Sequence, residues 1–263
     1  MHLTFLGTCA GTEPMPDRKH TSFAIEYNGK VYWFDAGAGC SYTAHLLGID
    51  LLSVRAIFIS HTHMDHVGGL ANLLWDIRKL NGREKDPARR ISDRRIDLFI
   101  PDLQVWQGVR QVLHGTEGQF AIDFDLAATD YADGAIFGDG DFQVRALHNR
   151  HLGIPATGEA WKSYSFGIEI AGKRIVFSGD IKDVAELEPL LQDCDLLLVE
   201  TGHHKVEDLC TYAREQPVKR LGFLHHGRAI LADPAGQERK ARHIFGDDVF
   251  LAADGMRIDL STL

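Results

Sequence analysis

Four side chains that can bind a divalent metal lie within the six residues from His61 to His66. They are the imidazoles of His61, His63 and His66 and the carboxylate of Asp65. Zinc and related divalent ions take imidazole nitrogen and carboxylate oxygen as ligands. His61 and His63 alternate, so on an extended backbone they point to the same side, whereas Asp65 and His66 are adjacent and diverge. The spacing therefore predicts ligands for one ion and further ligands for a second.

Further residues of these types follow short apolar segments later in the chain. Three predicted strands end in this way: 144–147 before His148 and His151, 175–177 before Asp180, and 218–224 before His225 and His226. Ligands at strand ends lie on one edge of a rigid sheet, which suits a fixed metal site. The residues alone leave the choice within each histidine pair open. Asp180 has an alternative role as a helix cap, but the presence of the other clusters of ligand-type residues favours metal ligation.

The apolar patterning predicts strands and helices that position these residues. Strands are expected at 3–6, 22–27, 30–35, 54–59, 96–100, 120–124, 143–147, 165–170, 174–177, 195–200, 218–224, 249–252 and 256–260, and helices at 41–47, 70–80, 103–113 and 234–245. Asn28-Gly29 marks a hairpin, and Asp65 and His66 should lie at the N-terminus of the helix over 70–80. Asp35, at a strand end, either supports the metal site or caps a turn. Two similar halves suggest two packed sheets with helices outside, in a single domain over 1–263.

Composition and charge narrow the class of protein. The formal net charge is −9, which argues against a protein that coats nucleic acid. Residues 78–95 carry eight Lys or Arg, and a solvated loop is favoured there over a phosphate-binding patch. The four cysteines show no disulfide spacing, and we find no signal peptide and no apolar run of membrane-spanning length. These features predict a cytoplasmic protein without a membrane partner.

Several motifs together resemble the metallo-β-lactamase superfamily of binuclear metal hydrolases. Within that superfamily, the chain is most similar to ribonuclease Z and its smaller phosphodiesterase relatives. The His-x-His-x-Asp-His element is the most specific part. The resemblance rests on Leu6–Thr8, Gly11, Pro14, Arg18, Ser22, Phe34–Gly37, Ile59–His66, Gly69–Leu70, Ser178–Asp180, Leu224–His225 and Ala253–Met256.

The resemblance implies an α/β (α+β) fold, the four-layer αββα sandwich, and two divalent ions. Zinc is favoured, with manganese or iron as alternatives. By position, the first ion would be held by His61, His63 and His151, the second by Asp65, His66 and His225, with Asp180 bridging both. A hydroxide that bridges the ions would be the nucleophile, and Asp65 could accept its proton. In ribonuclease Z-like enzymes a histidine 22 residues before the last ligand donates a proton. His203 has that spacing, with Glu200 to orient it and His204 as the alternative donor.

The function favoured by this resemblance is hydrolysis of a small or nucleotide-like phosphodiester. The alternative is an acyl hydrolase that cleaves a lactone, thioester or lactam, because the same chemistry attacks carbonyls. A non-hydrolytic iron protein is disfavoured, because di-iron relatives have a carboxylate where this chain has His63. A tRNA 3′-endonuclease is also disfavoured, since only the short loop 152–162 follows His151 and no basic arm is present. The oligomeric state stays open, a homodimer being one option.

Overall fold

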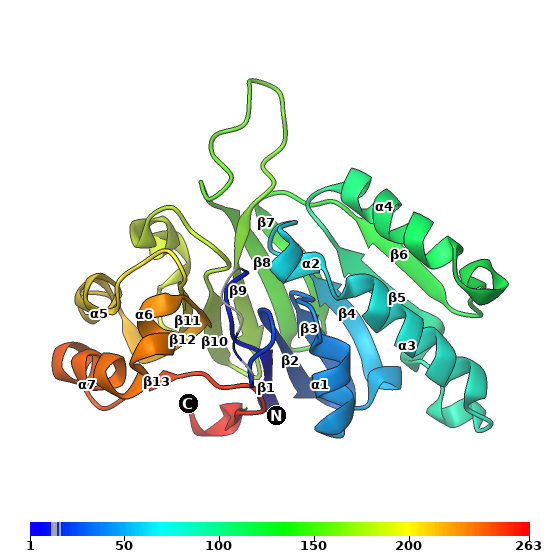
Figure 1. Cartoon of the computed structure of the whole chain (residues 1–263), viewed down its shortest axis with the longest axis horizontal. Coiled ribbons are helices and arrows are strands. Elements are labelled where there is room, and N and C mark those ends of the chain that lie inside the picture. Colours follow the sequence, from blue (N-terminus) through cyan, green and yellow to red (C-terminus); the bar gives the residue numbers. More distant parts are fainter. Residues whose placement is uncertain (12–14, 16) are drawn as a thin grey trace. The chain divides into compact units, whose positions relative to one another are not determined.

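The computed structural model describes residues 1–11, 15 and 17–263, which form two compact units (Figure 1). Unit 1 comprises Met1–Gly7, Asp17–Asp130 and Asp254–Asp259. Unit 2 comprises Thr8–Pro16, Tyr131–Ala253 and Leu260–Leu263. Each unit contains one seven-stranded sheet, so the two predicted sheets are confirmed. The single domain over 1–263 stays a prediction, and Pro14, one of the motif residues, lies outside the described residues.

The sheet of unit 1 has the strand order β14-β1-β2-β3-β4-β5-β6. Its strands are β1 (His2–Gly7), β2 (Ser22–Tyr27), β3 (Lys30–Phe34), β4 (Val54–Phe58), β5 (Arg95–Phe99), β6 (Asp125–Thr129) and β14 (Arg257–Asp259). β14 and β1 to β3 pair antiparallel, whereas β3 to β6 pair parallel. The predicted β2–β3 hairpin is confirmed, and both of its turn residues, Asn28 and Gly29, have positive φ, as a tight two-residue hairpin requires.

Four α-helices accompany this sheet: α1 (Cys40–Leu46), α2 (Met64–Val67), α3 (Leu70–Arg83) and α4 (Leu103–His114). Helix α3 buries Leu70, Leu73, Leu74 and Ile77, which are three or four residues apart, and they pack in one cluster with Trp33 and Ile57 of the strands. Short 3-10 turns cover Leu51–Ser53, Pro87–Arg89, Ser92–Arg94 and Glu117–Phe120.

Two expectations for unit 1 were wrong. Asp65 and His66 lie on the separate helix α2 and not at the start of α3. The helices are divided at Gly68 and Gly69, where the Gly69 amide donates to the Ala36 carbonyl at 2.7 Å. A Cβ on Gly69 would lie 2.3 Å from the Gly37 carbonyl oxygen, so the backbones meet there too closely for a side chain. The strand predicted at 120–124 is absent, and the strand of that region is β6.

The sheet of unit 2 has the strand order β13-β12-β11-β10-β9-β8-β7. Its strands are β7 (Gly134–Asp139), β8 (Phe142–His148), β9 (Tyr164–Ile170), β10 (Lys173–Phe177), β11 (Cys194–Thr201), β12 (Val218–His226) and β13 (Val249–Leu251). β7 to β10 pair antiparallel, and β10 to β13 pair parallel. β11 is buried along its whole length, which explains its nearly continuous apolar sequence.

Three α-helices belong to unit 2: α5 (Val206–Arg214), α6 (Arg228–Ala232) and α7 (Pro234–Phe245), coloured yellow to orange in Figure 1. Leu209 and Cys210 of α5 share a buried cluster with Leu197 and Phe223 of the sheet. Further 3-10 turns cover Val184–Leu190 and Leu260–Thr262. Among the described residues, no helix is both long and apolar enough to cross a membrane.

The burial of α3 predicts a large stability loss on truncation of Leu73, whose side chain is fully buried. We expect Leu73→Ala to lower the free energy of unfolding by about 2–5 kcal/mol, because it removes buried methyl groups and leaves a cavity. Val112→Ala on α4 should change it by no more than ~0.5 kcal/mol, since Val112 is 64% exposed. Urea unfolding followed by circular dichroism measures both, and equal midpoints would contradict the packing described for α3.

Candidate functional site

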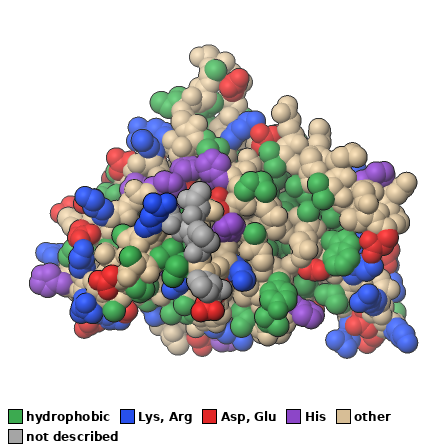
Figure 2. All heavy atoms as spheres, viewed as in Figure 1, with side chains coloured by type: hydrophobic (Ala, Val, Ile, Leu, Met, Phe, Trp, Pro, Cys, Tyr) green, Lys and Arg blue, Asp and Glu red, His purple; other side chains and the backbone are tan. Residues whose placement is uncertain are grey.

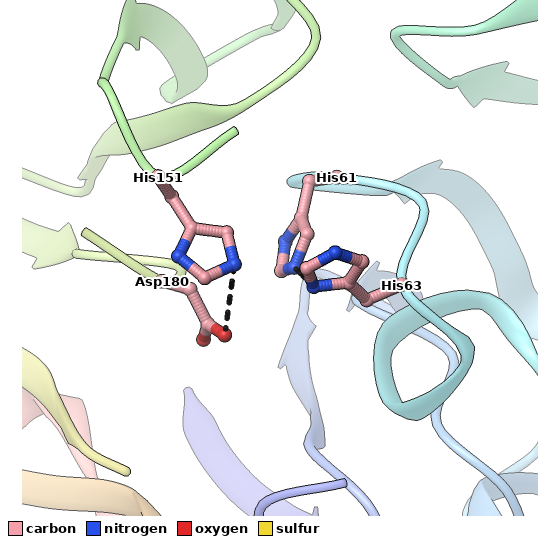
Figure 3. Close-up of side chains that lie close together, drawn as sticks. All are labelled: His61, His63, His151 and Asp180. Atoms are coloured by element: carbon pink, nitrogen blue, oxygen red, sulfur yellow. Dashed lines mark hydrogen bonds and ion pairs between the residues drawn. The ribbon is translucent and has the colours of Figure 1, made fainter. Parts of the chain in front are cut away.

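In unit 1, the predicted ligands gather just beyond the end of β4. His61 Nε2 and His63 Nδ1 lie 3.1 Å apart, and Figure 3 shows the two imidazoles next to each other. His61 is buried and His63 is exposed. The Asp65 carboxylate faces the His66 ring, with Oδ2 at 3.5 Å from Nε2. The extended approach to His63, followed by the single turn of α2, thus brings all four side chains of the motif to one place within this unit.

Asp35 holds His66 in its orientation. The Asp35 carboxylate accepts from the Ser60 amide at 2.7 Å and from the Ser60 hydroxyl at 2.8 Å, and it faces His66 Nδ1 at 2.7 Å. All three residues are buried. Because a carboxylate accepts hydrogen bonds, Nδ1 is the donor, and Nε2 is turned toward Asp65 with its lone pair available to a metal. Asp35 therefore orients a candidate ligand, as in the first of the two roles that the sequence left open.

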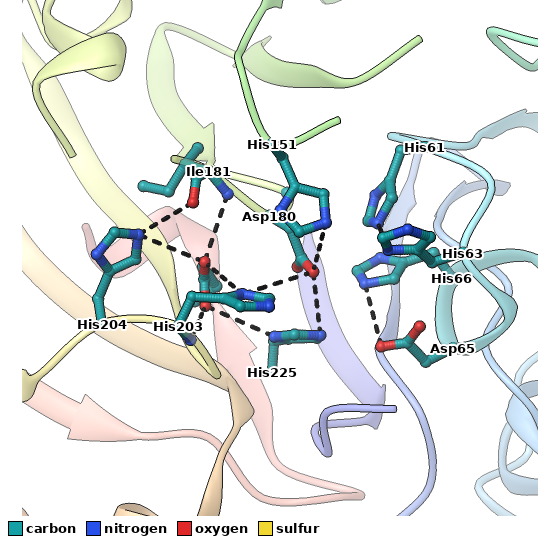
Figure 4. A network of polar contacts seen from close by, with 12 residues as sticks. His61, His63, Asp65, His66, His151, Asp180, Ile181, His203, His204 and His225 are labelled. Atoms are coloured by element: carbon teal, nitrogen blue, oxygen red, sulfur yellow. Dashed lines mark hydrogen bonds and ion pairs between the residues drawn. The ribbon is translucent and has the colours of Figure 1, made fainter. Parts of the chain in front are cut away.

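In unit 2, two histidines flank the buried carboxylate of Asp180. Asp180 Oδ2 lies 3.6 Å from His151 Nε2 and 3.4 Å from His225 Nε2 (Figures 3 and 4). Asp180 follows β10, whose last residues are apolar and buried, and Gly179 before it has φ +55°, which glycine tolerates best. These three residues come from three different strand ends, as the sequence predicted.

The structure also separates the two members of the first histidine pair, His148 and His151. His148 is directed to Asp133, with Nδ1 at 2.6 Å from Oδ2, and its ring stacks on Trp161 at 4.0 Å between centroids. His151 instead has its backbone amide bonded to Asn149 Oδ1 at 3.1 Å and its ring beside Asp180. Trp161 thus packs on a histidine at the base of the loop 149–163.

Glu200 connects the candidate proton donor His203 to His225, and Figure 4 labels both histidines beside Asp180. Its buried carboxylate accepts from the His203 backbone amide at 2.9 Å, and Oε1 lies 3.0 Å from His203 Nδ1. Burial alone would raise the pKa of Glu200, but the contacts with His203 and His225 outweigh it and lower the pKa to about 2. The hydrogen bond to Glu200 raises the pKa of His203 above its ordinary value. The contact with Glu200 therefore favours the protonated imidazole of His203, whose side chain is 47% exposed.

His204 is placed differently from His203. Its Nε2 donates to the Ile181 carbonyl at 3.1 Å and lies 3.6 Å from Glu200 Oε1. His203 Nδ1, by contrast, lies 3.8 Å from Asp180 Oδ2. The position of His203 beside Asp180 favours it over His204 as the donor.

The supporting residues Ser60, Asp133 and Asn149 were not found by sequence reasoning. Ser60 directly precedes His61, and Asn149 lies between His148 and His151, so proximity to the motifs was the only signal. Asp133 lies in the turn before β7, a strand that the patterning did not predict.

The donor sets fit divalent metal ions. Two ligands on a tetrahedral zinc ion, each about 2.0–2.1 Å from it, lie about 3.3–3.5 Å apart. The 3.4 and 3.6 Å separations around Asp180 and the 3.5 Å separation between Asp65 and His66 are close to this value and longer than good hydrogen bonds. Imidazole and carboxylate donors, oriented by Asp35 and Glu200, make these residues suitable for divalent metal binding.

Known proteins share this fold. A ribonuclease Z of Nitrosopumilus maritimus (strain SCM1) is 26% identical over 317 residues, with 99% of this chain and 100% of that protein aligned. Human tRNase Z, short form, superposes with a TM-score of 0.73 at 20% identity, covering 99% of each chain. The metallo-β-lactamase fold protein YhfI from Bacillus subtilis superposes with a TM-score of 0.74 at 17% identity, covering 98% of this chain and 99% of that one.

Fold and donor residues together define a metal-dependent hydrolase of the metallo-β-lactamase superfamily, in its ribonuclease Z-like branch. The predicted fold class is confirmed. The family described as Anti-Pycsar protein Apyc1 matches residues 1–245. The chain belongs to that family.

The role of Asp35 predicts that Asp35→Asn weakens metal binding. An amide cannot accept from Ser60 and His66 as a carboxylate does, so His66 loses its fixed orientation. We expect about 10–100-fold weaker zinc affinity, measured by competition with a chromophoric chelator. Asp247→Asn, at a fully exposed carboxylate, is the control and should bind zinc as the parent protein does. Unchanged affinity in Asp35→Asn would contradict the orienting role.

Proposed function

We propose that this protein hydrolyses a small or nucleotide-like phosphodiester. The observation that carries the proposal is the position of His203 beside Asp180, with a contact to Glu200 that raises the pKa of the imidazole. An alkoxide leaving group needs a proton when the ester bond breaks, whereas attack on an activated acyl group does not depend on such a donor. The similarity to ribonuclease Z, an enzyme named for its action on RNA, also supports phosphodiester chemistry.

The proposed ligand sets are those implied by the superfamily resemblance. His61, His63 and His151 hold the first ion in this proposal, Asp65, His66 and His225 hold the second, and Asp180 contributes to both. Zinc is the favoured ion, with manganese or iron as alternatives, and elemental analysis of the purified protein identifies it. Divalent ions bound there would lower the pKa of a water molecule toward 7 and neutralise charge on the phosphoryl oxygens.

The protein's own residues then supply proton transfer and orientation. In the proposed reaction Asp65 accepts a proton from the attacking water, and His203 gives its proton to the departing oxygen. Glu200 fixes the His203 ring through Nδ1, so Nε2 is the nitrogen that delivers the proton. Glu200 also stabilises the positive charge of the imidazole, because its own pKa of about 2 keeps it ionised.

The loop after His151 and the charge of the molecule favour a small substrate over tRNA. The loop 152–162 after His151 is mostly exposed and contains a single basic residue, Lys162. On the face drawn in Figure 2, Lys and Arg side chains are interspersed with Asp and Glu. Binding of a long RNA backbone relies on clustered positive charge, and the net charge here is −9. Because the relatives are named ribonuclease Z, RNA is tested as a substrate beside small diesters.

We further propose that the protein works in the reducing environment of the cytoplasm. Light scattering of the purified protein distinguishes a monomer from a homodimer. All four cysteines are buried and form no disulfide. Burial raises the pKa of Cys40, Cys194 and Cys210 to about 12. Thiols of this kind are unreactive packing groups, as expected where disulfides do not form.

A substrate panel tests the proposal directly. The zinc-loaded protein is assayed with bis(p-nitrophenyl) phosphate, cyclic and linear dinucleotides, a 3′-extended RNA, a lactone, a thioester and a β-lactam. We expect turnover of small diesters, which a chelator and Asp180→Ala abolish because both remove the metal. Turnover of acyl substrates alone would establish the acyl-hydrolase alternative, and cleavage of the RNA alone would establish a nuclease.

A second test concerns His203 and the leaving group. His203→Ala should lower kcat about 10²–10³-fold on a diester with an alkoxide leaving group, because that oxygen needs a proton. The loss should be less than about tenfold with p-nitrophenolate, which leaves without one. Equal losses on both substrates would contradict proton donation.

The pH profile of kcat gives a further readout of the same pair. Activity with an alkoxide leaving group needs protonated His203, so it falls as pH rises through the pKa of His203. Glu200→Gln removes the contact that raises this pKa and should move the falling limb to lower pH. Glu207→Gln, on the surface helix α5, is the control and should leave the limb in place.

A further inference from the structure

We infer that His226 is a positioning residue that holds the side chain of His225 toward Asp180 through a β-bulge at the end of β12. The inference rests on the proposed function in one respect, namely that His225 is a metal ligand. His226 itself does not face Asp180. Its imidazole is completely buried and is directed into the body of unit 2.

The register of β11 and β12 reveals the bulge. Glu200 pairs with Leu224, and the next residue of β11, Thr201, pairs with His226. His225 is therefore the extra residue of β12 at this register shift. Its φ is +51°, in the left-handed region that non-glycine residues rarely adopt. A bulge of this kind redirects a side chain at the edge of a sheet, and it persists only where surrounding contacts determine it.

The main chain of His226 is fixed on the side away from β11. Its amide donates to the Thr8 carbonyl at 2.7 Å, and its carbonyl accepts from the Ala10 amide at 3.1 Å. The residue after the bulge is thereby paired with two segments at once, Thr8–Ala10 and the end of β11.

The imidazole of His226 adds two further connections. Nε2 lies 2.8 Å from the Ala252 carbonyl, which can only accept, so Nε2–H is the donor. Nδ1 lies 3.1 Å from the Thr201 hydroxyl. Ala252 in turn donates its amide to the Phe223 carbonyl at 2.8 Å. The ring therefore joins the segment after β13 to the end of β11, on either side of the bulge.

Two glycines show how closely His225 is fitted. A Cβ on Gly202 would lie 2.6 Å from His225 Nδ1, and a Cβ on Gly227 would lie 3.1 Å from the Gly202 Cα. The His225 ring thus lies against bare backbone, 3.4 Å from Asp180 Oδ2. If β12 returned to regular pairing, every residue from His225 onward would change its partner and the face to which it points. Holding His226 in its place is therefore what keeps His225 in this position.

The test compares His226→Leu with His226→Gln. Leucine fills the space without hydrogen bonds, whereas glutamine offers an N–H to the Ala252 carbonyl and an oxygen to the Thr201 hydroxyl. Crystal structures of the metal-free variants give φ of His225 and its distance from Asp180. Zinc affinity, by chelator competition, gives a second readout. Val249→Ala, which truncates a buried side chain of β13 away from the bulge, is the control for lost stability.

We expect His225 to leave the left-handed region in His226→Leu, with about tenfold or weaker binding of one zinc equivalent. His226→Gln and Val249→Ala should keep both the conformation and the affinity. A left-handed His225 with unchanged zinc affinity in His226→Leu would overturn the inference. Should that variant not fold, Thr201→Val removes one of the two ring contacts and must show the same changes to a smaller degree. If the parent protein binds no zinc, the proposed function fails, while φ of His225 still decides the positioning role.

Discussion

A buried carboxylate is costly unless hydrogen-bond donors or positive charge surround it, and this requirement shapes the group of candidate ligands in each unit. Asp35 in unit 1 is enclosed by Ser60 and His66, and Glu200 in unit 2 is enclosed by His203 and His225. In each case the carboxylate lies at the end of an apolar strand or just beyond it. The compensation that makes burial tolerable also fixes the imidazoles, so stability and chemistry depend on the same contacts.

The two units thus use a common construction. In each unit, an apolar strand that pairs with a parallel neighbour comes to its end, and a residue with positive φ changes the direction of the chain there. Asp35, Gly179 and His225 all have positive φ at such points. Backbone strain of this kind, of the order of 1–3 kcal/mol for a non-glycine residue, persists because the sheets on which it stands are rigid and buried. The rigid scaffold permits the narrow spacing of donors around Asp180.

Much of the fold followed from patterning. The β2–β3 hairpin was specified by Asn28-Gly29, and α3 by its regularly spaced apolar residues, because both signals are local. The strand expected at 120–124 was wrong, since its apolar residues pack beside α4 without pairing. β6 and β7 were missed because alanine and glycine give them little strand signal. The division between α2 and α3 depends on a backbone contact with Ala36 that no local pattern reveals.

The sequence by itself determined which chemistry is available: imidazoles and carboxylates after strands, spaced for divalent metal, with His203 22 residues before His225. Only the tertiary structure decided how each of these side chains is used. Adjacent histidines such as His225 and His226 are equivalent in composition and in local propensity. Their directions differ because a bulge, set by hydrogen bonds to Thr8, Thr201 and Ala252, turns His225 toward Asp180 and His226 toward Thr201 and Ala252. Those partners lie 24 or more residues away in the chain, beyond the reach of any local pattern.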